Sequence, residues 1–199
     1  MEATAVLYQN GTNTTGGTLK FVQTNSSTPV NVIGPISGLV ANSTHGFHVH
    51  TYPVLDYSPN CLSAGDHFNP YNTSHGPMTA DITGRHVGDL GNLVMNANGS
   101  VYVNFTDSII QLYNMTQSII NRTIIIHFNR DDGGLGNSST SNTTGNSGDR
   151  ILCGLIVRST NTTSVTTTPS NKSSTIILNM KLFLFIFSIV FIIGHTVVY

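Results

Sequence analysis

Short runs of alternating hydrophobic and polar positions dominate most of the chain. Val, Ile, Phe, Tyr and Thr fill these runs, and Gly, Asn and Asp separate them. A pleated strand favours β-branched and aromatic side chains, so this pattern is typical of an all-β domain. It predicts strands at residues 5–8, 18–24, 30–36, 46–51, 93–95, 101–105, 109–112, 123–128 and 151–157. About eight short strands with two long loops indicate a Greek-key barrel or sandwich.

The two long loops are residues 52–84 and 129–149, where Gly, Asn, Asp and Ser accumulate. A loop of more than about 15 residues is uncommon inside a compact domain unless it is functional. The first loop holds a cysteine and histidines, and a further histidine follows its end. We therefore expect a metal, a disulfide or both to order it.

The C-terminal part of the chain has a different pattern. We divide the sequence into a domain at residues 1–157, a Ser/Thr-rich stalk at 158–175 and a hydrophobic tail at 176–199. As a helix, residues 182–199 would span about 27 Å, which is just enough for a bilayer. Small residues, a short spacer and a terminal apolar tail favour a GPI-attachment signal. A retained membrane helix, flanked by Lys181, and a soluble core helix are the alternatives.

The charge and the glycosylation sequons of the chain bear on its binding partners and its location in the cell. Charged residues make up 9% of the chain and the net charge is −1, so no basic surface for nucleic acid is predicted. The start of the chain has neither the basic nor the apolar region of a signal peptide. We expect a glycoprotein on the extracellular face of the cell membrane, with a cytosolic tail-anchored protein as the alternative. Asn-x-Ser/Thr sequons, some of them expected by chance, begin at Asn10, Asn13, Asn25, Asn42, Asn72, Asn98, Asn104, Asn114, Asn121, Asn137, Asn142, Asn161 and Asn171.

The histidines carry the chemistry that the sequence suggests. In the predicted strand at residues 46–51, alternation puts His48 and His50 on one face and Phe47 and Val49 on the other. Imidazole suits copper and zinc, although this pair alone is equally compatible with a solvated strand face. Further histidines follow at His67, His75, His86 and His127. One mononuclear site takes three or four protein ligands, so a dinuclear site with one shared ligand uses this set economically.

Four motifs make the stretch from residue 45 to residue 154 resemble the copper,zinc superoxide dismutase family. They are Gly-Phe-His-Val-His at 46–50, Ala-Gly-Asp-His-Phe-Asn-Pro at 64–70, Arg-His-Val-Gly-Asp-Leu-Gly-Asn at 85–92 and Gly-Asn-Ser-Gly-Asp-Arg-Ile-Leu-Cys-Gly at 145–154. The match extends over roughly residues 3–157. The resemblance implies an eight-stranded Greek-key β-barrel, a metal-binding and disulfide loop, and an electrostatic-type loop.

The resemblance also implies a role for each matching residue. Arg150 would hold superoxide beside copper, since a guanidinium is always charged and donates to small anions. Asp131 would hydrogen-bond ligating histidines of both sites, and His45 would be structural. Cys61 and Cys153, which the spacing alone leaves as a disulfide or as buried thiols, would form the intrasubunit disulfide. Copper would bind His48, His50, His67 and His127, and zinc would bind His67, His75, His86 and Asp89.

The implied activity is dismutation of superoxide to dioxygen and hydrogen peroxide, with His67 as the bridge between the metals and as a proton carrier. The alternative is a non-enzymatic surface metal-binding protein or glycoprotein ligand with a dismutase-like domain. Four departures from the family pattern matter. Residues 137–148 carry no charge and Asp149 directly precedes Arg150, so we expect weak electrostatic steering of superoxide. The segment after His50 is longer than in typical members, and Leu152 replaces a commonly small residue. Both lie near the family's usual dimer contact, so the resemblance does not decide whether the protein forms a homodimer.

Overall fold

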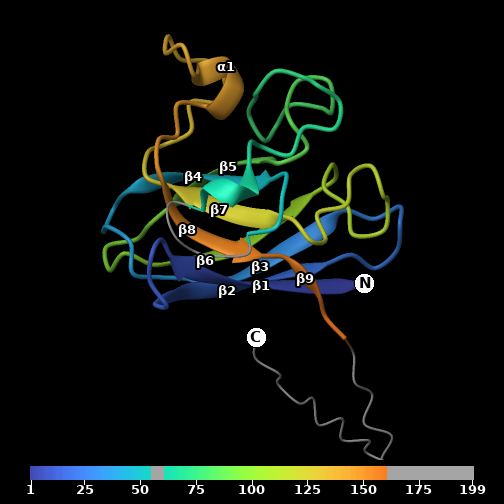
Figure 1. The fold of residues 1–199 in the computed structure, drawn as a ribbon, viewed down its shortest axis with the longest axis horizontal. Helices are drawn as coiled ribbons and strands as arrows, with labels where there is room; N and C mark the ends of the chain where they lie inside the picture. Colours follow the sequence, from blue (N-terminus) through green and yellow to red (C-terminus); the bar gives the residue numbers. More distant parts are fainter. Residues whose placement is uncertain (55–60, 161–199) are drawn as a thin grey trace, which may run out of the picture. The chain divides into compact units, whose positions relative to one another are not determined.

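The structure is a computed structural model that describes residues 1–54 and 61–160. Its described part holds nine strands and two short helices, and one antiparallel sheet curls into a barrel (Figure 1). The strands are β1 (Glu2–Gln9), β2 (Thr15–Val22), β3 (Val30–Ile36), β4 (Thr44–His50), β5 (Asp89–Val94), β6 (Val101–Asp107), β7 (Thr123–His127), β8 (Arg150–Leu155) and β9 (Val157–Arg158). The helices are the 3₁₀ turn η1 (Leu62–Ala64) and α1 (Ser141–Thr144).

The strand order confirms the expected eight-stranded Greek-key barrel. Neighbouring strands run β5-β4-β7-β8-β1-β2-β3-β6, and the short β9 pairs with β1 outside this path. The pairs β4–β7 and β3–β6 join strands that are not consecutive in the chain, as Greek-key connections require. The end strands β5 and β6 contact each other, so the barrel is nearly closed. Closure leaves few exposed strand edges.

The barrel interior determines which side chains face outward on β4 and β7. Phe47 and Val49 of β4 and Ile124 and Ile126 of β7 are fully buried in the main hydrophobic core. Burying each such side chain is worth about 1.5–3 kcal/mol, so together they fix the strand register. The alternate residues of these strands, among them the histidines, therefore lie on the outer face of the barrel wall.

The two long loops cover this outer face. Figure 1 shows the segment after η1 and the segment bearing α1 on the same side of the barrel, over β4 and β7. The loops are joined to each other because the backbone N–H of His75 donates to the carbonyl of Asn142 at 2.9 Å. Every residue of β4 from His45 onward is consequently buried, on both faces of the wall.

One predicted strand is wrong. Residues 109–112 form bends with a single isolated bridge between Gln111 and Ser118, instead of a strand. The carboxylate of Asp107 accepts hydrogen bonds from the backbone N–H groups of Ile109 and Ile110, and this turn ends β6. The apolar side chains of this segment are still buried in the core. Their hydrophobicity therefore reflects burial in a turn and not strand pairing.

Other strand bounds shift by a few residues. Most notably, the predicted strand at residues 151–157 divides into β8 and β9 at Ile156, which hydrogen-bonds to Arg122 and Asn121. The loops fall where the sequence placed them. Most of the predicted stalk and all of the predicted tail lie outside the described residues. Within residues 1–54 and 61–160, the helices are too short to span a membrane.

A disulfide joins Cys61, in the first loop, to Cys153 of β8, as predicted. The two residues are 92 positions apart in the sequence. Both are fully buried in a second small cluster with Val54, Ala64 and Ile125, on the outer side of the wall. The bond therefore anchors the first loop to the barrel beside β7.

Reducing this disulfide should destabilise the domain markedly. Closing a loop of this length removes about 4–5 kcal/mol of entropy from the unfolded chain in the simple model, which corresponds to a fall of about 10 °C in Tm. Calorimetry of the metal-free protein with and without dithiothreitol measures this. A Cys61→Ser/Cys153→Ser variant should melt at the reduced temperature in both conditions, and an equal effect of dithiothreitol on the variant would contradict the assignment.

Candidate metal centre

Two groups of buried ligands lie side by side on the outer face of the barrel wall. In each group the candidate ligand atoms all lie within 4.8 Å of one another. The groups share one side chain, that of His67. The first group is His48, His50, His67 and His127, and the second is His67, His75, His86 and Asp89.

Strand alternation supplies three members of the first group. His48 and His50 come from β4, and His127 ends β7 on the same outer face. The close packing above them explains the glycine that precedes Phe47. A Cβ on Gly46 would lie 2.6 Å from Ser147 Oγ and 3.1 Å from His48 Cε1, so any larger residue would push the second loop off the site.

His67 is positioned by backbone pairing with the end of β4. It forms an isolated bridge with His50, and the hydroxyl of Thr51 donates to the His67 carbonyl at 3.2 Å. The next residue, Phe68, is capped by Arg122, whose guanidinium carbon lies 3.4 Å from the ring centroid. A partly buried cation–π contact of this kind is worth about 1 kcal/mol. His67 is therefore held on a rigid segment although it lies in a loop.

Hydrogen bonds orient the imidazoles of the first group. The Nδ1 atoms of His50 and His127 donate to the carbonyls of Gly65 and Gly148, at 2.8 and 3.0 Å, because a carbonyl only accepts. Their Nε2 atoms therefore keep a lone pair, and they lie 3.2 Å apart. His48 Nδ1 and His67 Nε2 are buried without any hydrogen-bond partner. Four converging nitrogens of this kind fit copper, for which imidazole is a suitable ligand.

The second group surrounds the carboxylate of Asp89. Its Oδ1 lies 2.9 Å from His67 Nδ1 and 3.2 Å from His86 Nδ1, and its Oδ2 lies 3.0 Å from His75 Nδ1. The last contact lacks hydrogen-bond geometry, so His75 Nδ1 is another buried nitrogen without a partner. Three nitrogens and one carboxylate are a tetrahedral set of the kind that zinc prefers.

Asp131 links the two groups. Its Oδ2 accepts from His48 Nε2 and its Oδ1 from His75 Nε2, both at 2.8 Å. Asn92 of β5 holds Asp131 through two hydrogen bonds, from its side-chain NH₂ to the Asp131 carbonyl and from the Asp131 N–H to its Oδ1. Gly145 allows the second loop to close over this link, because a Cβ there would lie 2.0 Å from Asp131 Oδ1.

The pKa values separate the two groups in the metal-free protein. Burial, followed by repulsion from neighbouring imidazoles, lowers the pKa of His48 and His50 well below the usual value. Burial likewise lowers the pKa of His127 to about 3. These imidazoles are neutral at pH 7, so their lone pairs are available to a metal.

At His75 and Asp89 of the second group, interactions between imidazoles and carboxylates outweigh the effect of burial on the pKa. Burial lowers the pKa of His75, but its contacts with Asp131 and Asp89 raise it to about 9. Burial would raise the pKa of Asp89, but interactions with His67, His75 and His86 hold it far below the usual range. This part of the site therefore favours a positive charge, which a divalent cation would supply.

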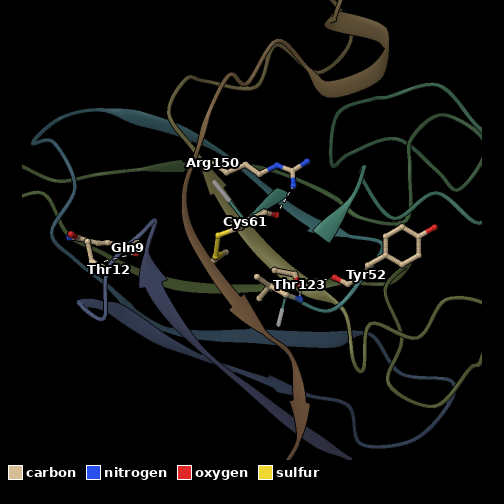
Figure 2. The surroundings of a disulfide bond; sticks show 8 residues. Gln9, Thr12, Tyr52, Cys61, Thr123 and Arg150 are labelled. Carbon is tan, nitrogen blue, oxygen red and sulfur yellow. Dashed lines mark hydrogen bonds between the residues drawn. A yellow bond between two sulfur atoms is a disulfide. The ribbon is translucent and has the colours of Figure 1, made fainter. Parts of the chain in front are cut away.

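Arg150, the first residue of β8, lies beside the first group. Its guanidinium donates to the carbonyl of Cys61 at 2.8 Å, as Figure 2 shows, and to that of Gly65 at 2.6 Å. Gly65 also accepts from His50, so the arginine and this imidazole share one anchor. Burial lowers the pKa of Arg150, but an arginine remains charged in proteins. The disulfide thus positions a cation at the site.

The other predicted residues are placed as follows. His45 contacts the His127 carbonyl through Nδ1 at 2.7 Å and Ser43 Oγ through Nε2 at 2.6 Å, which suits a structural residue. A cavity of about 700 Å³ leads to His67 and His86 from the surface, between the two loops. The role of Asn92 in holding Asp131 was not predicted. Asn92 belongs to the motif at residues 85–92, but its partner Asp131 is distant in sequence.

Comparisons with known proteins agree with this geometry. The copper/zinc superoxide dismutase (SODC) family matches residues 15–156. The chain is 44% identical over 152 residues to a Cu-Zn superoxide dismutase of Schizosaccharomyces pombe, covering 76% of this chain and 96% of the relative. It is 43% identical over 159 residues to Cu-Zn superoxide dismutase 5 of Dictyostelium discoideum, covering 80% and 99%. It is 43% identical over 157 residues to an extracellular Cu-Zn superoxide dismutase of Brugia pahangi, covering 77% and 74%.

Fold, ligand groups and relatives lead to one assignment. The two buried ligand groups fit copper and zinc, and the relatives share most of the described domain with this chain. The chain therefore belongs to the copper/zinc superoxide dismutase family and is an oxidoreductase that acts on superoxide with copper and zinc as its metals.

Proposed function

We propose that dismutation occurs at a paired centre in which His67 is shared by the two metals. Copper would be held by His48, His50, His67 and His127, and zinc by His67, His75, His86 and Asp89. One observation carries the assignment: His67 is the side chain common to both ligand groups. Its Nδ1 faces the Asp89 group, and its buried Nε2 has no hydrogen-bond partner.

The overall reaction consumes two superoxide anions and two protons, and yields one dioxygen and one hydrogen peroxide. Copper, when bound, supplies the one-electron change that takes up an electron from one anion and returns it to the next. The protein supplies proton transfer, orientation and access. His67 Nε2 is the atom suited to hold a proton, since it is buried and otherwise unpartnered. Water entering through the cavity would restore that proton.

Arg150 would bind and orient the anion. Two of its donors are committed to the carbonyls of Cys61 and Gly65, so the side chain is held in place before substrate arrives. A guanidinium has five N–H donors, which leaves donors for a small oxyanion. Zinc would mainly fix the orientation of His67 and the shape of the first loop.

We also propose that the domain at residues 1–157 is displayed on the cell surface by the stalk at 158–175 and the tail at 176–199. The tail's apolar composition and the sequons support this location. The Brugia pahangi relative is named as extracellular. GPI attachment and a retained membrane helix remain the two forms of this proposal.

Replacing one copper ligand should separate the two metals. We expect His127→Ala to lose copper, keep zinc and lose dismutation, because His127 belongs to the first group only. His86→Ala is the reciprocal variant and should lose zinc first. Metal analysis and superoxide consumption of the purified proteins measure this. A wild-type protein with both metals bound but no dismutation would instead favour the non-enzymatic alternative.

Removing the charge of Asp131 should weaken both sites together. The amide of Asp131→Asn cannot accept hydrogen bonds from both His48 and His75 as the carboxylate does. Mutating a residue that orients metal ligands usually lowers metal affinity about 10–100-fold, so we expect a loss of about 10-fold or more for each metal. Competition with a metal chelator measures the affinities. Asp132→Asn removes a neighbouring carboxylate that contacts Ser141 instead, and it should leave both affinities unchanged. Equal losses in the two variants would contradict the linking role.

Treating intact cells with a phospholipase specific for GPI anchors tests the form of attachment. Release of the dismutase into the medium would establish a GPI anchor, because the enzyme cuts the lipid and leaves the protein soluble. Retention, with extraction only by detergent, would establish a membrane helix. A protein that alkaline carbonate washes off the membrane would contradict both forms.

A further inference from the structure

The cavity that leads to His67 carries one fixed charge of the same sign as the substrate. Among the described residues that line it, Asp66 is the only carboxylate, and neither lysine nor arginine is present. The other lining side chains are histidines, asparagines, serine and threonines, including Asn142, Thr143 and Thr144 of the second loop. A superoxide anion that enters therefore passes Asp66, an exposed carboxylate.

The backbone of Asp66 is held firmly although its side chain is exposed. Its carbonyl accepts hydrogen bonds from Thr51 N–H at 2.9 Å and from Thr51 Oγ1 at 3.1 Å. Thr51 is itself held by Arg122, which donates to the Thr51 carbonyl at 2.6 Å. The charge therefore stays at the cavity, directly before His67 in the chain.

Asp66 also lies near Arg150, the cation beside the first ligand group. Arg150 donates to the carbonyl of Gly65, the residue that precedes Asp66. Burial lowers the pKa of Arg150, and the charge of Asp66 acts in the opposite direction. Asp149, which the sequence suggested as the residue that would weaken Arg150, does not line the cavity at His67; it lines a different hollow, together with Arg150 itself.

The other lysines and arginines of the described residues, Arg130 and Arg158 among them, do not line this cavity. Lys20 pairs with Glu2 on the far strands β1 and β2, and Arg85 is buried against Asp107. Arg122 stacks on Phe68. The second loop offers no charge between residues 137 and 148. Asp66 is thus the one fixed charge on the described lining of this cavity, and Arg150 is held close to it through the Gly65 carbonyl.

We propose that Asp66 is a specificity-determining residue that disfavours small anions at the mouth of the metal site and so limits the association of superoxide. This inference rests on the proposed function, because it takes superoxide to reach the copper group through this cavity. It concerns the delivery of the anion and not the chemistry at the metals.

The test compares the full-length protein, loaded with copper and zinc, with Asp66→Asn. At low ionic strength we expect the variant to dismutate superoxide about three-fold faster, since one charge at close range in a watery site changes the approach energy modestly. The difference should vanish above about 0.2 M salt, where the Debye length is below 8 Å. The wild-type rate should vary little with salt, whereas the variant's rate should fall as salt is added.

Azide gives a second readout that does not depend on turnover. It is an inert monovalent anion whose binding to copper changes the visible absorption spectrum. Its dissociation constant should be about three-fold lower for Asp66→Asn at low ionic strength. If the wild-type protein binds metals but is inactive, the proposed function fails, while the azide titration still tests Asp66.

Two further variants control for other causes. Glu2→Gln makes the same change in net charge far from the cavity, on β1, and should behave as wild type. Asp66→Glu keeps the charge and should also behave as wild type. The proposal would be overturned if Glu2→Gln raised the dismutation rate as much as Asp66→Asn does. It would also be overturned if Asp66→Asn bound both metals normally but left the rate and the azide affinity unchanged. If Asp66→Asn does not load metal, Asp66→Ser replaces it.

Discussion

The site depends on the burial of one face of two adjacent strands. Phe47 and Val49 on β4, with Ile124 and Ile126 on β7, fill the barrel interior. A shift of one residue in either strand would turn these side chains outward and bring the histidines into the core. The same apolar contacts that stabilise the barrel therefore set the positions of three ligands on its outer face. The ligand geometry follows from the barrel's core and needs no separate scaffold.

Covering the three imidazoles of this strand face requires hydrogen-bond partners for them, because buried polar atoms are costly without partners. The loops supply these partners with backbone carbonyls, Gly65 for His50 and Gly148 for His127, and with the carboxylate of Asp131 for His48. The ring nitrogens that have no partner are those that face the centres of the two groups. The disulfide contributes by anchoring the loop that supplies Gly65 and orients Arg150.

Period-two alternation and the family resemblance predicted the fold class and the residues that the structure brings together. They failed where an effect depends on side-chain contacts between distant segments. Residues 109–112 have the composition of a strand, yet the Asp107 carboxylate bonds their N–H groups and turns the chain. Asn92 stabilises Asp131 across 39 positions, which no local pattern reveals. The fold also brings Asp66 near Arg150, although the two residues are 84 positions apart in the sequence.

These observations divide the protein's function between two kinds of interaction. The electron and proton chemistry depends on short-range contacts, which the barrel core, Asp131 and the disulfide fix within a few ångströms. Delivery of the anion depends on charges that act over a Debye length, and these belong to exposed loop residues that no core contact constrains. A residue such as Asp66 can therefore change the rate of encounter without disturbing the ligand groups. Because the described surface near the cavity is almost uncharged, even one carboxylate has a large relative effect there.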